Sequence, residues 1–306
     1  MGQRPLKVGI QLPEVERDVR WPELLDMTRA IEDLGFDSAW VGEHLLYRWA
    51  DRPPRGPWEA WTLMAAIAAS TSRIAFGPLV ACTNFHNPAL LAKQAATIDE
   101  ISGGRFILGL GAGWNDTEFR AFGFPFDHRI DRFEEAFTII RTLLHEGAID
   151  FDGRFYQARD CELLPRGPRP GGLPLMVGSK GPRMLRIALP HVDAWNVWWA
   201  DTGNAAAGVP RLRDLVDGVA RTVGRDPAAI ERTVAVFVRL PGGQGRVEGS
   251  GQADTIQPLE GSPEVMAEVL RAYAREGIGH VQLVVDPIDL ASIRALGPVL
   301  TALDRT

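Results

Sequence analysis

Short apolar runs alternate with amphipathic segments along nearly the whole chain. Residues 7–12 (KVGIQL) form the first apolar run, and the apolar side chains of 24–34 then recur at the spacing of one helix face until Gly35. Near-continuous apolar runs are typical of parallel strands buried on both faces, and helical spacing is typical of helices that pack on them. The pattern predicts strands at 7–12, 38–42, 73–80, 105–110, 173–177, 192–197, 233–240 and 280–285. It predicts a helix after each strand, at 24–34, 58–70, 88–101, 130–144, from 182, 205–223, 262–276 and 290–303.

Eight strand–helix units in succession favour a closed barrel over an open sheet. The 306 residues match the length of one such barrel with insertions. Two helix starts have the expected signals, because Asn87 precedes Pro88 and Ser262 precedes Pro263, a capping side chain followed by proline. We therefore expect an α/β fold, a TIM-type (β/α)8 barrel that forms one domain over residues 1–306.

Two segments, at about 147–172 and 241–261, interrupt the alternation. The first contains a hairpin pattern that turns at Asp152 and Gly153, followed by a Pro/Gly-rich stretch, and the second is rich in Gly and polar residues. Segments of this length in a compact domain are usually lids, binding loops or irregular surface insertions. We expect each to be either a lid over the site or a surface insertion.

Composition narrows the class of protein. Apolar residues make up 45% and charged residues 24%, as in globular proteins, and the formal net charge is −6. This charge argues against nucleic acid or an anionic membrane as a partner, since both call for a basic patch. Two cysteines make no disulfide framework, and neither a signal peptide nor an apolar stretch of membrane-spanning length is present,. We expect a cytoplasmic protein.

Candidate chemistry lies at the carboxyl ends of the predicted strands, where barrels of this type have their active sites. Glu43 and His44 follow the second strand. A carboxylate and an imidazole there can perform general acid–base catalysis near neutral pH, although a structural pair that caps the next segment has the same appearance. Nothing in the sequence supports a metal site, since the spacings of known metal motifs are absent,.

Glycine-rich turns follow two further strands. Gly109, Gly111 and Gly113 remove side chains from one side of the chain, which allows either a flat ligand or tight packing against the backbone,. Trp114 comes next and is a candidate wall for a ring. Residues 178–181 (GSKG) lie between a strand and a helix, where backbone N–H groups suit a phosphate, although such residues also serve as simple caps,.

Residues 77–126 (GPLVACTNFHNPALLAKQAATIDEISGGRFILGLGAGWNDTEFRAFGFPF) resemble the luciferase-like monooxygenase superfamily, in particular its branch of deazaflavin (coenzyme F420)-dependent oxidoreductases. Weaker matching pieces near Asp37, from Pro174 and from Gly261 occur in the family's order. The resemblance implies a barrel that holds either deazaflavin F420 or FMN, with the ring in the barrel mouth and a ribityl phosphate to anchor. It also implies a homodimer.

The resemblance assigns roles to individual residues. Glu43 and His44 match the family's acid–imidazole pair, in which the acid contacts the ring or sets the imidazole tautomer and the imidazole donates a proton. Pro78 and Leu79 match a bulge of the family that contains a non-proline cis peptide bond. Ala81 replaces a threonine that bonds to the ring, so either Thr83 or Asn84 takes over this contact or the contact is absent.

The remaining assignments concern the cofactor's backbone and phosphate contacts. Ala112 and Gly113 match backbone that touches the cofactor, whereas Trp114 replaces the catalytic glutamate of the sugar-phosphate dehydrogenases and argues against that reaction. The phosphate-side loop matches Gly178, Ser179, Lys180 and Gly181.

Three functions remain open on these grounds. The first is hydride transfer with deazaflavin F420, and the second is a monooxygenase that uses reduced FMN from a separate flavin reductase. The third is a non-catalytic flavin-binding homologue. An NAD-dependent enzyme is disfavoured because the glycine spacing at 109–113 differs from the dinucleotide fingerprint,.

The small-molecule substrate is expected to be apolar or aromatic, because Leu46, Phe85, Trp195, Trp198 and Trp199 lie at strand ends or near them. Cys82 is expected to line the pocket without acting as a nucleophile.

Overall fold

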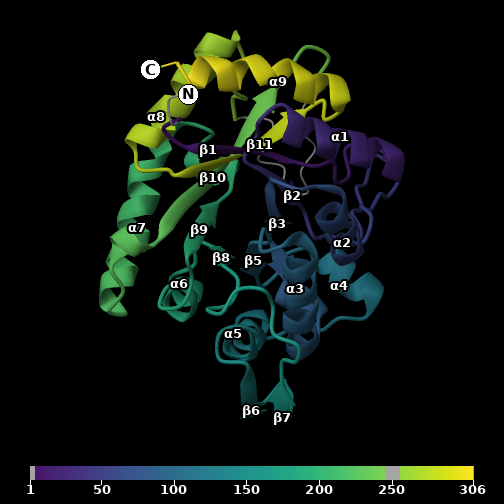
Figure 1. Cartoon of the computed structure of the whole chain (residues 1–306), viewed down its shortest axis with the longest axis vertical. Coiled ribbons are helices and arrows are strands. Elements are labelled where there is room, and N and C mark those ends of the chain that lie inside the picture. The colour runs from purple at the N-terminus through teal and green to yellow at the C-terminus, as the bar shows by residue number, and fades with distance from the viewer. Residues whose placement is uncertain (1–3, 245–255, 306) are drawn as a thin grey trace.

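Parallel strands wind into a barrel in the computed structural model, which describes residues 4–244 and 256–305 (Figure 1). The strands follow one another around it in the order β3, β2, β1, β11, β10, β9, β8, β5 and β4. Their bounds are β1 Lys7–Gln11, β2 Ser38–Val41, β3 Ala75–Pro78, β4 Ala81–Cys82, β5 Leu108–Gly111, β8 Leu175–Gly178, β9 Ala194–Val197, β10 Glu231–Arg239 and β11 His280–Asp286.

β3 and β4 are two parts of one barrel strand, so the barrel has eight strands in the described residues. The chain bends between them at Leu79 and Val80, whose peptide bond is cis. β4 pairs with β5, and a bridge between Phe76 and Phe106 joins β3 to the residues just ahead of β5. This bridge closes the ring and confirms the predicted (β/α)8 barrel. The sequence predicted an unbroken strand over 73–80, and the structure corrects it to a shorter strand followed by a bend.

Helices cover the outside of the barrel (Figure 1). Their bounds are α1 Trp21–Asp33, α2 Ala60–Ser70, α3 Pro88–Ser102, α5 Arg129–His145, α6 Pro182–Ala188, α7 Val209–Thr222, α8 Pro263–Arg275 and α9 Leu290–Leu303. Asn87 and Ser262 cap α3 and α8 as predicted, each accepting a backbone N–H of the first turn. α9 packs against both α8 and α1, so the last helix lies beside the first.

Short helices lie at the strand ends and in the connections. The 3₁₀ helices are η1 Thr83–Phe85, η2 Trp199–Thr202, η3 Ala206–Gly208 and η4 Pro227–Ala229. The sequence did not predict α4, Asp116–Phe122, which begins after the N-cap Asn115. α4 is the short helix that brings a further carboxylate to the site described below.

The insertion at 147–172 contains the predicted hairpin, formed by β6 Ala148–Asp152 and β7 Gln157–Glu162. The hairpin packs along α5, and Glu135 of α5 accepts the backbone N–H groups of Arg154, Phe155 and Tyr156 at its tip. It contributes no described residue to the cavity at the barrel mouth. Of the two alternatives this favours a surface insertion, because the segment connects a helix to the following strand on the outer surface (Figure 1).

Most of the segment at 241–261 lies outside the described residues, so the lid prediction there stays a prediction. Its described end runs beside β10, where the Leu259 backbone bonds to Phe237 and Arg239. Within residues 4–244 and 256–305, none of the helices combines the length and the apolar character needed to cross a bilayer.

Polar side chains are interspersed in the barrel interior. Ser38 bonds to both His280 and the Trp40 indole, at 2.7 Å each. Higher in the barrel, the Asn196 amide donates to Thr233 and Gln282. These networks satisfy buried polar groups that an apolar core would leave unpaired, and Asn196 reaches the cavity above.

Candidate functional site

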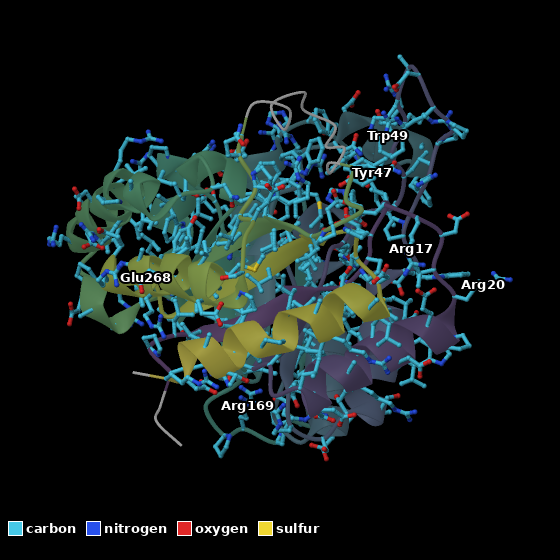
Figure 2. All side chains as sticks on the ribbon, turned by 90° about the horizontal axis from the view of Figure 1, so that it is seen from above. Arg17, Arg20, Tyr47, Trp49, Arg169 and Glu268 are labelled. Atoms are coloured by element: carbon cyan, nitrogen blue, oxygen red, sulfur yellow. The ribbon has the colours of Figure 1, made fainter. Side chains whose placement is uncertain are left out.

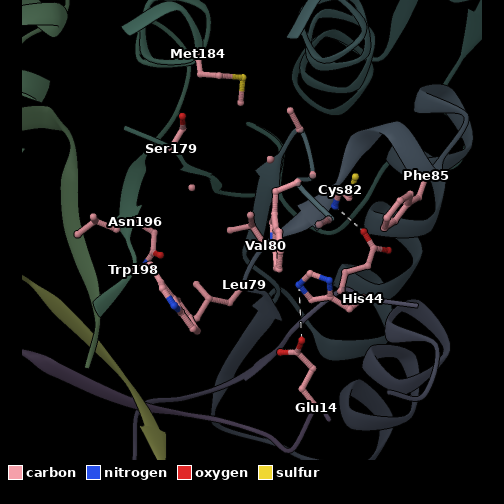
Figure 3. A pocket seen from close by; sticks show the side chains of 18 of the residues that line it. Glu14, His44, Leu79, Val80, Cys82, Phe85, Ser179, Met184, Asn196 and Trp198 are labelled. Atoms are coloured by element: carbon pink, nitrogen blue, oxygen red, sulfur yellow. Dashed lines mark hydrogen bonds and ion pairs between the residues drawn. The ribbon is translucent and has the colours of Figure 1, made fainter. Parts of the chain in front are cut away.

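A cavity of about 500 Å³ opens at the carboxyl ends of the strands. Ten predicted site residues line it: Glu43, His44, Leu79, Ala81, Ala112, Gly113, Trp114, Gly178, Ser179 and Lys180. Four predicted site residues are not in its lining: Pro78, Thr83, Asn84 and Gly181. Figure 3 shows His44 and Cys82 on one side of the cavity, Asn196 and Trp198 on the other, with Leu79 and Val80 between them.

His44 is held between two carboxylates. Its Nδ1 lies 2.9 Å from Oε1 of Glu118. Its Nε2 lies 3.7 Å from Oε1 of Glu14, the contact marked in Figure 3. Because an ionised carboxylate only accepts hydrogen bonds, Nδ1 must bear a proton. Nε2 is then the ring atom that can gain or lose a proton at the cavity.

Both carboxylates are themselves positioned by donors. Glu118, from α4, accepts the backbone N–H of Leu45 at 2.8 Å. Glu14, from the loop after β1, accepts the Tyr47 hydroxyl at 2.9 Å and the Gln11 amide at 3.0 Å. These bonds fix the carboxylates and, through them, the imidazole.

The pKa of His44 is raised above its ordinary value. Burial alone would lower it, because burial disfavours the imidazolium, but the carboxylates of Glu14, Glu118 and Glu43 outweigh this effect,. The imidazole therefore keeps its charge to a higher pH than an ordinary histidine does. A group in this state can serve as a general acid.

Glu43 has a different environment from the one expected. Its side chain is only 5% exposed, and it accepts the Trp61 indole N–H at 2.7 Å, the Cys82 backbone N–H at 2.6 Å and His86 Nε2 at 2.7 Å. Glu43 thus bonds to His86 and not to His44, so the interpretation that it sets the His44 tautomer is wrong. Glu118 has that place.

The cis peptide bond lies between Leu79 and Val80, one residue after the expected position at Pro78 and Leu79. The Val80 side chain occupies a slot walled by glycines of neighbouring strands. A Cβ on Gly111 would lie 2.9 Å from Val80 Cγ2, and one on Gly178 would lie 3.0 Å from both Val80 methyl groups. These glycines make room for Val80, so tight packing, and not direct contact with a flat ligand, explains their lack of side chains.

The other glycines of this turn also face protein atoms. A Cβ on Gly109 would lie 2.4 Å from the Pro78 carbonyl oxygen, and one on Gly113 would lie 2.5 Å from Cys82 Sγ. Gly113 also has φ +73°, which favours glycine,. The turn is therefore fitted to the bend at residues 78–82, and the bend in turn shapes the cavity.

Thr83 and Asn84 lie behind the cavity wall. Both are buried; the Thr83 hydroxyl donates to the Gly111 carbonyl, and the Asn84 amide donates to the carbonyls of Ala112 and Arg129. Neither lines the cavity, which favours the alternative that the contact of the missing threonine at Ala81 is absent. They stabilise the backbone of the wall instead.

Cys82 lines the cavity as predicted and is buried. Burial raises the pKa of its thiol well above the ordinary value, and the Glu43 carboxylate adds to this effect. A thiol in this environment stays protonated at neutral pH and is a poor nucleophile.

The loop at 178–181 forms one rim of the cavity. The Ser179 hydroxyl accepts the Gly181 N–H, and the Lys180 ammonium is paired with Asp201. Ser179 Oγ and the Lys180 ammonium are the groups of this loop that can contact a phosphate. Lys180 would then leave Asp201 and pair with the phosphate.

Of the tryptophans Trp195, Trp198 and Trp199, in and directly after β9, only Trp198 lines the cavity. Trp195 and Trp199 are fully buried in the core. Trp114 is 51% exposed at the mouth, in edge contact with His44. Tyr47 stacks on Trp49 near the same rim, and Figure 2 shows these two side chains close together.

Several site residues were missed by the sequence prediction. Glu14 falls among the residues that follow β1, but nothing in the sequence separates it from its neighbours. Glu118 lies four residues after Trp114 on a helix that was not predicted. The other lining residues to which the sequence prediction assigned no role are Gln11, Val15, Tyr47, Val80, Ile130, Met184, Asn196, Val197 and Asp201. Within the described residues, no group of three or more His, Cys, Asp and Glu side chains is arranged to hold a metal ion.

Comparisons with known proteins agree with this geometry. The model of the family described as luciferase-like monooxygenase matches residues 7–240. The chain is 33% identical over 183 residues to the 5,10-methylenetetrahydromethanopterin reductase of Archaeoglobus fulgidus, covering 60% of this chain and 50% of that protein. It is 34% identical over 189 residues to the F420-dependent glucose-6-phosphate dehydrogenase of Intrasporangium calvum, covering 60% and 55%. The matched region thus spans about half the length of these curated relatives.

A solved structure has the same fold. An F420-dependent secondary alcohol dehydrogenase, determined in complex with an F420–acetone adduct, superposes with a TM-score of 0.81 at 20% sequence identity. The match covers 97% of this chain and 99% of that one. At this identity the similarity establishes the barrel fold alone.

Proposed function

The chain belongs to the luciferase-like monooxygenase family, and from this premise we propose that it is an oxidoreductase that transfers hydride to or from the deazaflavin coenzyme F420. The observation that carries the proposal is the position of His44 at the cavity, held by Glu118 and Glu14 with a raised pKa. Hydride transfer to a carbonyl compound leaves an oxygen that needs a proton, and a charged imidazole supplies one.

The names of the relatives support the choice of cofactor. The glucose-6-phosphate dehydrogenase and the secondary alcohol dehydrogenase are both F420-dependent by name. The alternative, a monooxygenase with reduced FMN, is favoured by the description of the family itself. The homodimer and, for this alternative, the separate flavin reductase stay predictions.

The cavity fits a flavin-type ring. Its volume of about 500 Å³ is in the range of small-molecule sites. The bend at Leu79 and Val80 forms one wall, and the small side chains of Ala81 and Ala112 leave room beside it. We propose that Leu79, Ala81, Ala112 and Gly113 hold the ring and that Ser179 and Lys180 hold the phosphate.

The residues of this chain then perform the following tasks. The bound deazaflavin supplies a carbon that accepts or donates a hydride. His44 holds a proton at Nε2 and donates it to the substrate oxygen during reduction, or accepts it during oxidation. Glu118 keeps the proton on Nδ1, and Glu14 stabilises the charged ring. Glu43 does not touch the proton path; it fixes the backbone of Cys82 and the His86 ring.

The proposal is tested by incubating the protein with reduced deazaflavin and a panel of ketones and aldehydes without oxygen, while the absorbance of the oxidised cofactor is followed. We expect cofactor oxidation that depends on both the protein and the carbonyl compound. Turnover that requires oxygen and reduced FMN would instead favour the monooxygenase, and binding of the cofactor without turnover would favour the non-catalytic homologue.

A further inference from the structure

We propose that the cavity selects a substrate with a flat apolar ring and no negative charge, and that Trp114 is the residue that recognises the ring. This inference rests on the proposed function, because it concerns the second ligand of the same cavity. It follows from the charges of the lining and from the exposure of one aromatic side chain.

The cavity lining is acidic. Glu14, Glu43, Glu118 and Asp201 contribute four carboxylates, whereas His44 and Lys180 are the cationic side chains among the described lining residues. Lys180, which pairs with Asp201, is the cation proposed for the cofactor phosphate, and His44 already lies between Glu14 and Glu118, so neither is left for an anionic substrate. An anionic substrate therefore meets a negative potential and must be desolvated as well.

Two arginines of neighbouring segments, Arg129 and Arg183, already have partners within the protein. Arg129 lies behind the wall, where its guanidinium donates to the Gly113 carbonyl at 2.7 Å and covers the Phe126 ring. Arg183, beyond the phosphate-side loop, pairs with Asp131 and Glu134. Neither is part of the lining, so neither offers a charge to an anionic substrate.

Trp114 presents an aromatic surface at the cavity mouth. It is 51% exposed although it lines the cavity. Its ring makes T-shaped contacts with His44 and Tyr47, at 5.7 Å and 6.2 Å between centroids. The exposed half of the side chain offers an aromatic surface, and such a surface is a common anchor for planar ligands,.

Apolar side chains line the cavity on several sides. They include Leu79, Phe85, Met184 and Trp198. Figure 3 shows Leu79 and Trp198 adjacent to one another across the cavity from His44. Because Trp114 contacts His44, a ring that stacks on Trp114 stays near this imidazole, where the proposed chemistry takes place.

The same features argue against a sugar phosphate. One relative is named for glucose 6-phosphate, a dianion at neutral pH that needs paired cations to bind. This chain has four carboxylates and a tryptophan in the lining and one lysine that is already paired. The substrate of that relative is therefore not the substrate class proposed for this chain.

Calorimetric titration of the full chain with benzyl alcohol, benzylamine and benzoate tests the inference, since the three probes share a ring and differ in charge. The titrations are made with and without bound deazaflavin. We expect the alcohol and the amine to bind at least about tenfold more tightly than benzoate at neutral pH and low salt. Trp114→Ala should weaken binding of the alcohol roughly three- to tenfold, and Trp114→Phe should restore most of it.

Two further variants complete the test. Trp58→Phe is the matched control, because Trp58 is 54% exposed but lies outside this cavity, and it should leave all three affinities unchanged. Asp201→Asn releases Lys180 and should tighten benzoate binding selectively. Benzoate binding as tight as that of the alcohol, no saturation with any probe, or a Trp114→Ala variant with unchanged affinity would overturn the inference. These experiments measure binding and not turnover. A protein that fails to transfer hydride can therefore still confirm or contradict this inference.

Discussion

The Nδ1 atom of His44 lies 2.9 Å from a carboxylate oxygen of Glu118, although the two residues are 74 positions apart in the chain. His44 follows β2, and Glu118 comes from α4 after β5, so only the closed barrel brings them together. The pair fixes the orientation of the imidazole. Because Nδ1 donates to Glu118, Nε2 is the ring atom that exchanges a proton. It is the relationship on which the proposed chemistry depends.

Glu118→Gln should lower the pKa of His44, because it removes one of the carboxylates that raise it. In the wild type the charged acid persists to a higher pH than for an ordinary imidazole, and the rate of carbonyl reduction falls as the pH rises through the raised pKa. In the variant this descending limb of the kcat profile should move to lower pH. Glu118→Asp, which keeps the charge, is the control. An unchanged profile in Glu118→Gln would contradict the assignment.

His44→Ala should lower kcat by roughly 10²- to 10⁴-fold, the usual contribution of a general acid. Cofactor affinity should change much less, because the side chain is assigned to the proton and not to the ring. Steady-state rates and a fluorescence titration with deazaflavin measure the two effects separately. His128→Ala, at the exposed start of α5, is the matched control and should leave both unchanged. Equal losses in rate and affinity would eliminate the acid role.

Gly111→Ala should disturb the cavity wall, since its Cβ would lie 2.9 Å from Val80 Cγ2. We expect cofactor affinity to fall roughly tenfold and the free energy of unfolding to fall by about 1–3 kcal/mol, as for other overpacked sites. The double variant Gly111→Ala/Val80→Ala should recover part of both losses. Gly218→Ala, in α7 with no atom within 4 Å of the new Cβ, should not lower stability,. Wild-type affinity in Gly111→Ala would refute the role of the Val80 slot.

His280 should make the protein sensitive to acid. Burial, with a smaller effect of Lys7, lowers the pKa of His280 to about 3, whereas in the unfolded chain the imidazole takes up its proton near pH 6.5. Between these values the unfolded state binds more protons, so stability falls as the pH decreases below about 6.5, by up to about 1.4 kcal/mol per pH unit from this group.

His280→Gln should flatten this dependence, because glutamine can keep a hydrogen bond to Ser38 without titrating. Urea unfolding of both proteins between about pH 5 and pH 7 measures the slope. Identical slopes in the two proteins would show that His280 is not the source of the acid sensitivity.

The sequence predicts the barrel well because burial of parallel strands and the helix caps at Asn87 and Ser262 are local signals. It also places His44 and Trp114 at the cavity, since residues at strand ends meet at one end of a barrel. The resemblance predicts the bend one residue too early, and the pattern of residues does not give its position, because Val80 fits there between glycines of β5 and β8. For the same reason the sequence leaves open whether these glycines make room for a ligand or for packing.

The partners of the titratable groups are a second limit. Glu43 and His44 are adjacent in sequence, which suggests a pair, but adjacent residues around a strand end point in different directions. Their actual partners, His86 for Glu43 and Glu118 for His44, come from other strand ends. Only the three-dimensional arrangement could assign them.

The most direct test of the central claim is a pair of fluorescence titrations of the purified full chain, one with deazaflavin F420 and one with FMN. We predict saturable binding of F420 that is at least about tenfold tighter than that of FMN. The affinity for F420 should be reduced in Gly111→Ala and nearly unchanged in His44→Ala. Tighter binding of FMN, or no binding of F420, would contradict the central claim.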